Sequence, residues 1–118
     1  MKSYMKITGI TLIAAIFFLT GLPGVHAEET KWQKEHPRRT QVNKRLNKQN
    51  KRIKQGVKSG KLTKQQAGQL HKEDRQIRQE ERDMASQNGG HITKQEQKTL
   101  NQQENAASKQ IYNEKHGQ

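Results

Sequence analysis

Hydrophobic residues recur at helical spacing from about residue 40 onward, and the first such stretch predicts a helix over residues 40–58. Its aliphatic side chains fall within about 60° of one another on a helical wheel of roughly 100° per residue. They form a narrow stripe that consists of Val42, Leu46, Ile53 and Val57. Gly56 and Gly60 are expected to break this helix.

The second helix is predicted over residues 63–87. Leu70, Ile77 and Met84 recur every seven residues, which is the spacing of a coiled-coil seam. Two acidic residues, Asp74 and Glu81, lie on the same side and weaken this seam. They are expected either to pair with basic residues of a neighbouring helix or to leave the packing loose and hydrated.

The third helix is predicted over residues 93–112, with Leu100, Ala107 and Ile111 on one face and Glu104 between them. The tail over residues 114–118 is expected to fray. Three helices that fold back at two glycine-containing turns make an all-α protein, an elongated and sparsely cored three-helix arrangement. The pattern leaves open whether the helices form a closed bundle or an open cradle.

One turn-and-helix-start pattern occurs twice, thirty residues apart. In each copy a glycine supplies a permissive backbone, an aliphatic residue lies just outside the helix, and a threonine is the N-cap. A Gln or Glu three residues after the threonine closes a capping box. The two sets are Gly60, Leu62, Thr63 and Gln66, and Gly90, Ile92, Thr93 and Glu96. The match indicates an internal repeat over residues 60–86 and 90–112.

The first 27 residues have the features of a signal peptide. Lys2 and Lys6 precede an apolar run of thirteen residues, and Val25 and Ala27 are small residues at the expected cleavage positions. The alternative is an uncleaved anchor, for which the run is short. We expect cleavage after Ala27 and a periplasmic or secreted protein. Residues 28–39 then form a flexible polar arm, and residues 40–118 form the helical domain.

The composition after the signal peptide limits the core. Of 91 residues only 17 are hydrophobic, and the chain has no cysteine that could form a disulfide or carry a lipid. A domain with so little to bury should be marginal or extended, or stabilised by self-association or a partner.

Positive charge is concentrated in one part of the chain. Residues 31–64 contain 13 basic residues and one acidic residue, whereas residues 65–118 contain eight of each. The end of the arm and the first helix therefore present a cationic face for an anionic partner. The candidate residues are Arg38, Arg39, Lys44, Arg45, Lys48, Lys51, Arg52, Lys54 and Lys58. The alternative reading is a solvated surface that aids solubility.

The helix starts resemble a known motif. Leu62-Thr63-Lys64-Gln65-Gln66 is similar to the Leu-Thr-x-x-Gln motif of periplasmic chaperones of the Spy/CpxP type, and Ile92-Thr93-Lys94-Gln95-Glu96 is a near copy. The resemblance implies a small exported helical protein that dimerises into a basic cradle for unfolded clients. The chain is poorer in Met and aromatic residues than that family. It is also similar to uncharacterised exported helical proteins of bacteria with a late Ile-Tyr pair, here Ile111-Tyr112.

Cofactor and enzyme chemistry find little support. The glycine turns resemble the second half of an EF-hand, but the early acidic ligands are missing. The histidines at positions 36, 71, 91 and 116 are scattered and form no metal-ligand pair in the sequence. No nucleophile motif, phosphate loop or convincing acid pair occurs. We therefore expect a non-enzymatic protein without a cofactor or metal.

Three functions remain. The first is a Spy/CpxP-like envelope chaperone, in which the basic face of the first helix attracts unfolded or acidic protein clients. The stripe through Leu46, Ile53, Leu70 and Ile77 then supplies short-range contact with the client or packs a homodimer. The second is a polyanion-binding protein for lipopolysaccharide, acidic lipid or nucleic acid. For nucleic acid no motif or stacking platform is present, and membrane contact should be weak. The third is a structural docking module.

Overall fold

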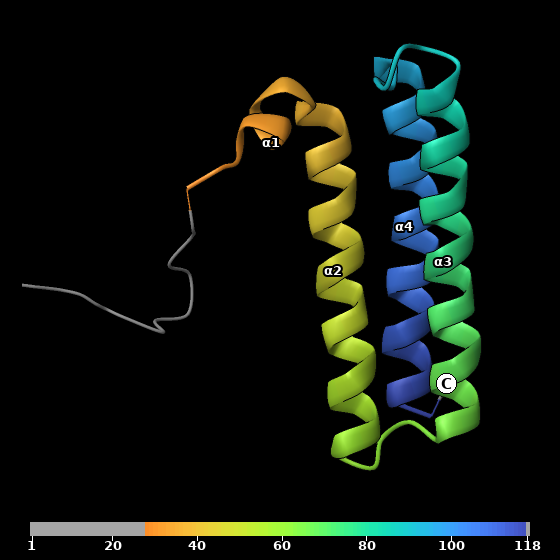
Figure 1. Cartoon of the computed structure of the whole chain (residues 1–118). Coiled ribbons are helices and arrows are strands. Elements are labelled where there is room, and N and C mark those ends of the chain that lie inside the picture. Colours follow the sequence, from red (N-terminus) through yellow and green to blue (C-terminus); the bar gives the residue numbers. More distant parts are fainter. Residues whose placement is uncertain (1–27, 118) are drawn as a thin grey trace, which may run out of the picture. The chain divides into compact units, whose positions relative to one another are not determined.

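The computed structural model describes residues 28–117, so the predicted signal peptide and its cleavage site lie outside the described residues. The described part contains no strand and has four helices (Figure 1). They are α1 (Lys31–Glu35), α2 (Pro37–Lys58), α3 (Lys64–Ser86) and α4 (Lys94–Lys115). The all-α prediction is confirmed.

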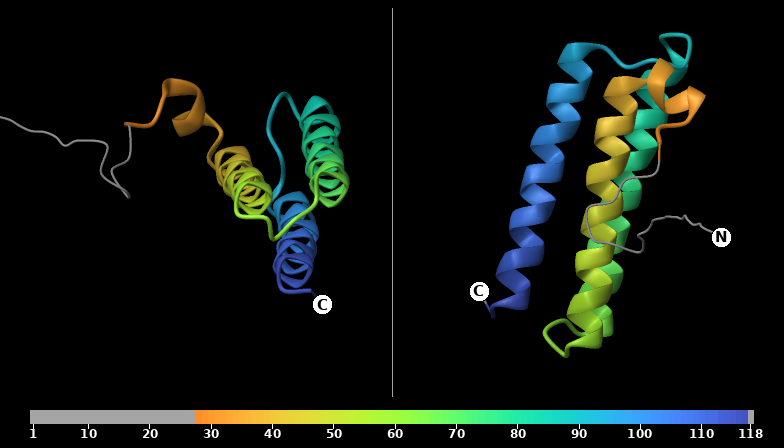
Figure 2. Two further views of the ribbon diagram at one scale, coloured as in Figure 1. Left: turned by 90° about the horizontal axis from the view of Figure 1, so that it is seen from below. Right: turned by 90° about the vertical axis from the view of Figure 1, so that its left-hand side faces the viewer.

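The three long helices form a closed bundle, and each of them packs against both others. α2 and α4 run in the same direction, and α3 runs antiparallel to them. Seen end-on in Figure 2, the three axes stand at the corners of a triangle. This arrangement leaves no open cradle between them.

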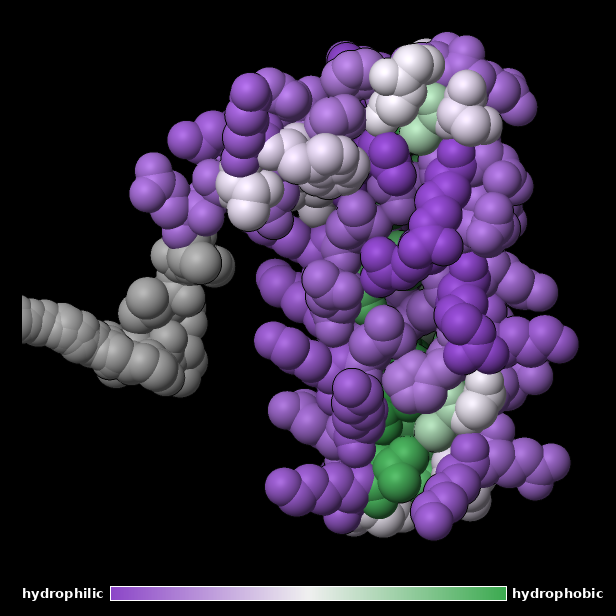
Figure 3. Space-filling view, in the orientation of Figure 1, coloured by the Kyte–Doolittle hydropathy of each residue, from purple (hydrophilic) through white to green (hydrophobic). Residues whose placement is uncertain are grey.

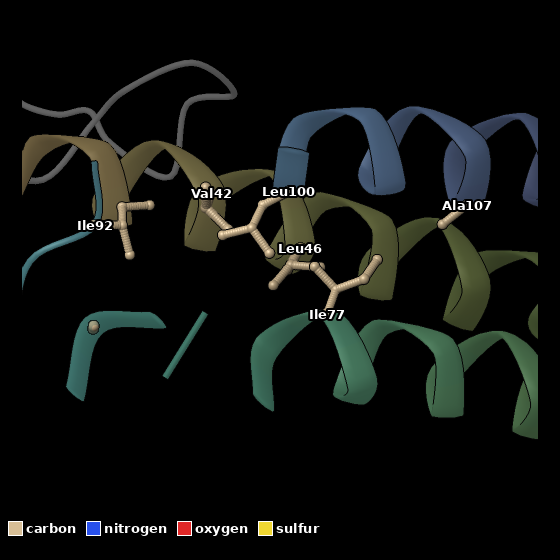
Figure 4. Close-up of a cluster of buried hydrophobic side chains, with 7 residues drawn as sticks. Val42, Leu46, Ile77, Ile92, Leu100 and Ala107 are labelled. Atoms are coloured by element: carbon tan, nitrogen blue, oxygen red, sulfur yellow. The ribbon is translucent and has the colours of Figure 1, made fainter. Parts of the chain in front are cut away.

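Most buried positions of the long helices are three or four residues apart, which keeps one side of each helix facing the bundle axis. The buried hydrophobic side chains make two clusters. One contains Val42, Leu46, Ile77, Ala85, Ile92, Leu100 and Ala107, most of which Figure 4 labels. The other contains Ile53, Leu62, Ala67, Leu70 and Ile111. The predicted stripes therefore meet in the interior.

Both predicted helix starts are confirmed. Thr63 and Thr93 cap α3 and α4, and each forms a complete capping box with Gln66 or Glu96. Gly60 and Gly90 have positive φ angles of 79° and 94°. Leu62 and Ile92, the residues just outside the two helices, are 4% and 2% exposed and close the two ends of the core. The aliphatic residue before each cap is thus a core residue.

The flexible arm predicted over residues 28–39 is wrong from Lys31 onward. α1 spans Lys31–Glu35, and α2 begins at Pro37 rather than at residue 40. Proline suits the first turn of a helix, where its missing N–H would have no partner. The hydroxyl of Thr40 donates to the carbonyl oxygen of Gln33 at 3.1 Å and ties α1 to α2.

The predicted helix end at residue 58 is confirmed, whereas the expected break at Gly56 and the expected fraying from residue 114 are wrong. Gly56 does not break α2, which continues to Lys58; its missing side chain makes room for Leu62, whose Cδ1 lies 2.5 Å from where a Cβ at position 56 would be. α4 continues past Tyr112 to Lys115, so Glu114 and Lys115 are helical rather than frayed. Gln110 donates to Glu114 at 2.8 Å, which supports this last turn.

Candidate anion-binding surface

α2 carries nine basic residues and no acidic one, and its arginines and lysines take different positions. Arg38, Arg45 and Arg52 are seven residues apart and face α4 or the turn before it. Arg52 donates to the hydroxyl and the carbonyl oxygen of Ser108 at 2.6 and 3.3 Å. Arg45 donates to Asn105 and lies 3.7 Å from the carboxylate of Glu104. These contacts fasten α2 to α4.

The remaining arginine of α2 is also held within the fold. Arg39 pairs with Glu81 at 2.8 Å, donates to the carbonyl oxygen of Gly90 at 3.1 Å, and lies 5.1 Å from the ring centroid of Trp32. Glu81 is 1% exposed, so the sequence-based expectation that an acid of the seam pairs with a neighbouring helix holds for it.

The five lysines of α2 lie on the side of the helix that faces away from the bundle interior. On a helical wheel they span an arc of roughly 120° on the side of α2 opposite the buried stripe. All five are exposed. We call this set the lysine face; it consists of Lys44, Lys48, Lys51, Lys54 and Lys58.

Amides separate the lysine face from α3. Arg78 of α3 donates to Asn43 and Asn47 at 3.2 and 3.3 Å, and His71 is 2.9 Å from the side-chain oxygen of Asn50. The candidate surface is therefore a ridge of ammonium groups between a flank of arginines and a flank of asparagines. The nine cations predicted as one face are therefore divided between this ridge and the contacts within the bundle. The seven-residue spacing of Arg38, Arg45 and Arg52 is the sequence signal that could have marked these three as contacts to another helix.

Histidines that are far apart in the sequence meet at one end of the bundle. His36 stacks on His91 with ring centroids 4.5 Å apart, and Trp32 stacks on His36 at 4.3 Å. This pairing was not predicted, because no local sequence signal connects His36 with His91. Within residues 28–117 no group of three or more His, Asp or Glu side chains is arranged to hold a metal ion. The column of rings anchors α1 to the turn between α3 and α4.

The aliphatic stripe proposed for client contact is not available on the surface. Leu46 and Ile53 are fully buried, and Leu70 and Ile77 are 1% and 6% exposed. The prediction that they contact clients or pack a dimer is wrong for the closed bundle. In Figure 3 the visible face is largely hydrophilic. Hydrophobic colour appears only in a narrow strip between the helices, in a small area near the lower end and in a small pale area near the top.

Two acids inside the bundle have raised pKa values. Burial raises the pKa of Asp74 to about 6, with Glu73 adding to the shift and Arg78 opposing it. Burial raises the pKa of Glu104 to about 7, against the effect of Arg45. Neither acid lies on the lysine face, so they do not contribute to anion binding there.

Comparison of the chain with protein-family models, with curated proteins and with solved structures finds no match. No helix among the described residues has both the length and the apolar character needed to cross a bilayer.

Proposed function

We propose that this chain is an exported, non-enzymatic protein of the bacterial envelope that binds anionic polymers through the lysine face of α2. The observation that carries the proposal is the segregation of charge on this helix. Its five lysines are all exposed and form a ridge on a helix without any acidic residue, and its arginines contact other parts of the bundle.

The geometry of the ridge favours an extended ligand. Fourteen residues separate Lys44 from Lys58, which corresponds to roughly 21 Å along the helix axis at about 1.5 Å per residue. A row of positive charges of this length matches a repeating polyanion better than a single small anion. Lysine ammonium groups act as point charges and lack the fork of a guanidinium. Binding should therefore be electrostatic and independent of sequence.

Retention on a heparin column and binding to double-stranded DNA and lipopolysaccharide, both followed against salt concentration, test this proposal. Replacing Lys44, Lys48, Lys51 and Lys58 with Gln should remove most of the binding and flatten its salt dependence, because four phosphate or sulfate contacts are lost. The matched control replaces four exposed lysines elsewhere with Gln, at the same cost in net charge. These are Lys72, Lys94, Lys98 and Lys109. Equal losses in the two variants would contradict the proposal.

The chaperone hypothesis rests on the Leu-Thr-x-x-Gln resemblance and has a separate test. It requires suppression of aggregation of a neutral unfolded protein at physiological salt. The apolar residues that would hold such a client are inside the bundle. We therefore expect no suppression for a neutral client, and suppression that survives the lysine-face substitutions would favour the chaperone function instead.

A further inference from the structure

A layer of polar side chains divides the core of the bundle. On α2, Gln49 lies between Leu46 of one hydrophobic cluster and Ile53 of the other. On α3, Asp74 lies between Leu70 and Ile77, again one from each cluster. Glu104 of α4 belongs to the same layer, because Gln49 binds its backbone oxygen and Asp74 acts electrostatically on its carboxyl group. We call these three side chains, one from each long helix, the central polar layer. All of them are buried, with exposed fractions of 3%, 3% and 0%.

The central polar layer lacks hydrogen-bond donors. The side-chain amide nitrogen of Gln49 donates to the backbone oxygen of Glu104 at 2.7 Å, so this bond does not satisfy any side-chain acceptor of the layer. Five acceptor atoms have no hydrogen-bond partner among the described residues: Oε1 of Gln49, both oxygens of Asp74 and both oxygens of Glu104. Buried acceptors without donors are costly, and ionised ones are the most costly. A proton on either carboxyl group changes an acceptor into a donor for its neighbours.

We propose that the central polar layer is a proton-operated switch. The three helices pack firmly at this layer when Asp74 or Glu104 binds a proton, and their packing weakens when both acids are ionised. In the protonated layer, a carboxyl O–H can donate to the other carboxylate or to Oε1 of Gln49. In the ionised layer, two like charges lie buried near each other and neither carboxylate accepts a hydrogen bond, so the three helices are held together less firmly at their middle.

The surrounding charges modify the switch without removing it. From α2, Arg45 faces Glu104 at 3.7 Å, and Arg39 is engaged with Glu81. From α3, Arg78 opposes the rise in the pKa of both acids. Glu73 adds to the rise in the pKa of Asp74, and Asp74 and then Glu81 add to the rise in the pKa of Glu104. Burial outweighs all of these and places the pKa of Asp74 at about 6 and that of Glu104 at about 7.

The direction of the effect follows from these values. An acid with a higher pKa in the folded state than in the unfolded state binds protons preferentially when folded, so a rising pH destabilises the fold. The loss should develop between about pH 4 and pH 8. His71 acts in the opposite direction, because burial, Lys54 and Arg75 lower its pKa and its contribution weakens as the pH falls. A His71→Gln background removes this opposing effect.

Thermal unfolding of residues 28–118, which contain the whole bundle, tests the switch. In the His71→Gln background we expect Tm to be higher at pH 5 than at pH 8 by roughly 10 °C. Adding Asp74→Asn and Glu104→Gln should raise Tm at pH 8 and abolish most of this difference. The control, Glu80→Gln with Asp83→Asn, changes two exposed acids of α3 and should keep it. A Tm that is flat or falls towards pH 5 before the acids are replaced overturns the proposal.

A second measurement does not depend on the folding of the variants. Carbon NMR of the side-chain carboxyl groups in the unaltered sequence should show Glu104 titrating near pH 7 and Asp74 near pH 6. Titration of both groups below pH 5 would overturn the proposal whatever the variants do.

Discussion

At the scale of single residues, arginine and lysine have different roles on α2 although both carry the same charge. A planar guanidinium can bind two acceptors at once, and Arg39 and Arg52 do so with partners on other elements. An ammonium group is compact and strongly hydrated, so the lysines remain outside. A charge count of α2 therefore overestimates the cations available to a partner.

The pair of Arg39 and Glu81 gives the prediction at this scale. Arg39→Met should destabilise the bundle by about 3 kcal/mol, because it leaves a buried carboxylate without its partner. Urea unfolding measures this loss. The double variant Arg39→Met, Glu81→Met should recover much of it, since both charges are then gone.

Arg38 provides the control for this substitution. It precedes Arg39, is exposed, and makes one long hydrogen bond of 3.4 Å to the carbonyl oxygen of Ile92. Arg38→Met should cost less than about 1 kcal/mol. Similar costs at both positions would show that the ion pair with Glu81 contributes little.

At the scale of helices, the local signals in the sequence were sufficient where the interactions are local. A capping box involves residues three positions apart, so both helix starts could be predicted. α1 could not be predicted, because contacts with residues outside this helix stabilise it. Thr40 of α2 binds Gln33 of α1. Trp32 of α1 stacks on His36, which stacks in turn on His91 from the turn before α4. Pro37 lies in the segment that was predicted to be a flexible arm, yet it is the first residue of α2.

Removal of either cap is the prediction at this scale. Thr63→Ala and Thr93→Ala should each lower the free energy of unfolding by about 1 kcal/mol, because an N–H of the first turn loses its acceptor. The losses should add when the two are combined, as expected for well-separated sites. Thr99→Ala, within α4, is the control and should be nearly neutral. Losses equal to that control would mean that the caps do not stabilise these helices.

At the scale of the whole molecule, the sequence indicated which residues are apolar but not what covers them. The stripe on each helix could have faced a client, a second copy or the other two helices. Three stripes of similar length close on one another, and this closure places Leu46, Ile53, Leu70 and Ile77 in the interior. The lysine face was predictable because it lies opposite the stripe of its own helix. The central polar layer was not, since its three residues come from three different helices.

Closure of the bundle leads to the last prediction, which concerns self-association. Among the described residues, the large hydrophobic side chains that remain exposed are Trp32 and Tyr112, at 40% and 51%. Stable dimers normally bury a broad, mainly apolar surface, which two separate aromatic residues do not supply. The lysine face adds repulsion between copies at low salt. Residues 28–118 should therefore sediment as a monomer at micromolar concentrations in both low and high salt. A dimer in both salts would mean that the helices also pair between copies, and a dimer in high salt alone would identify the lysine face as the barrier to association.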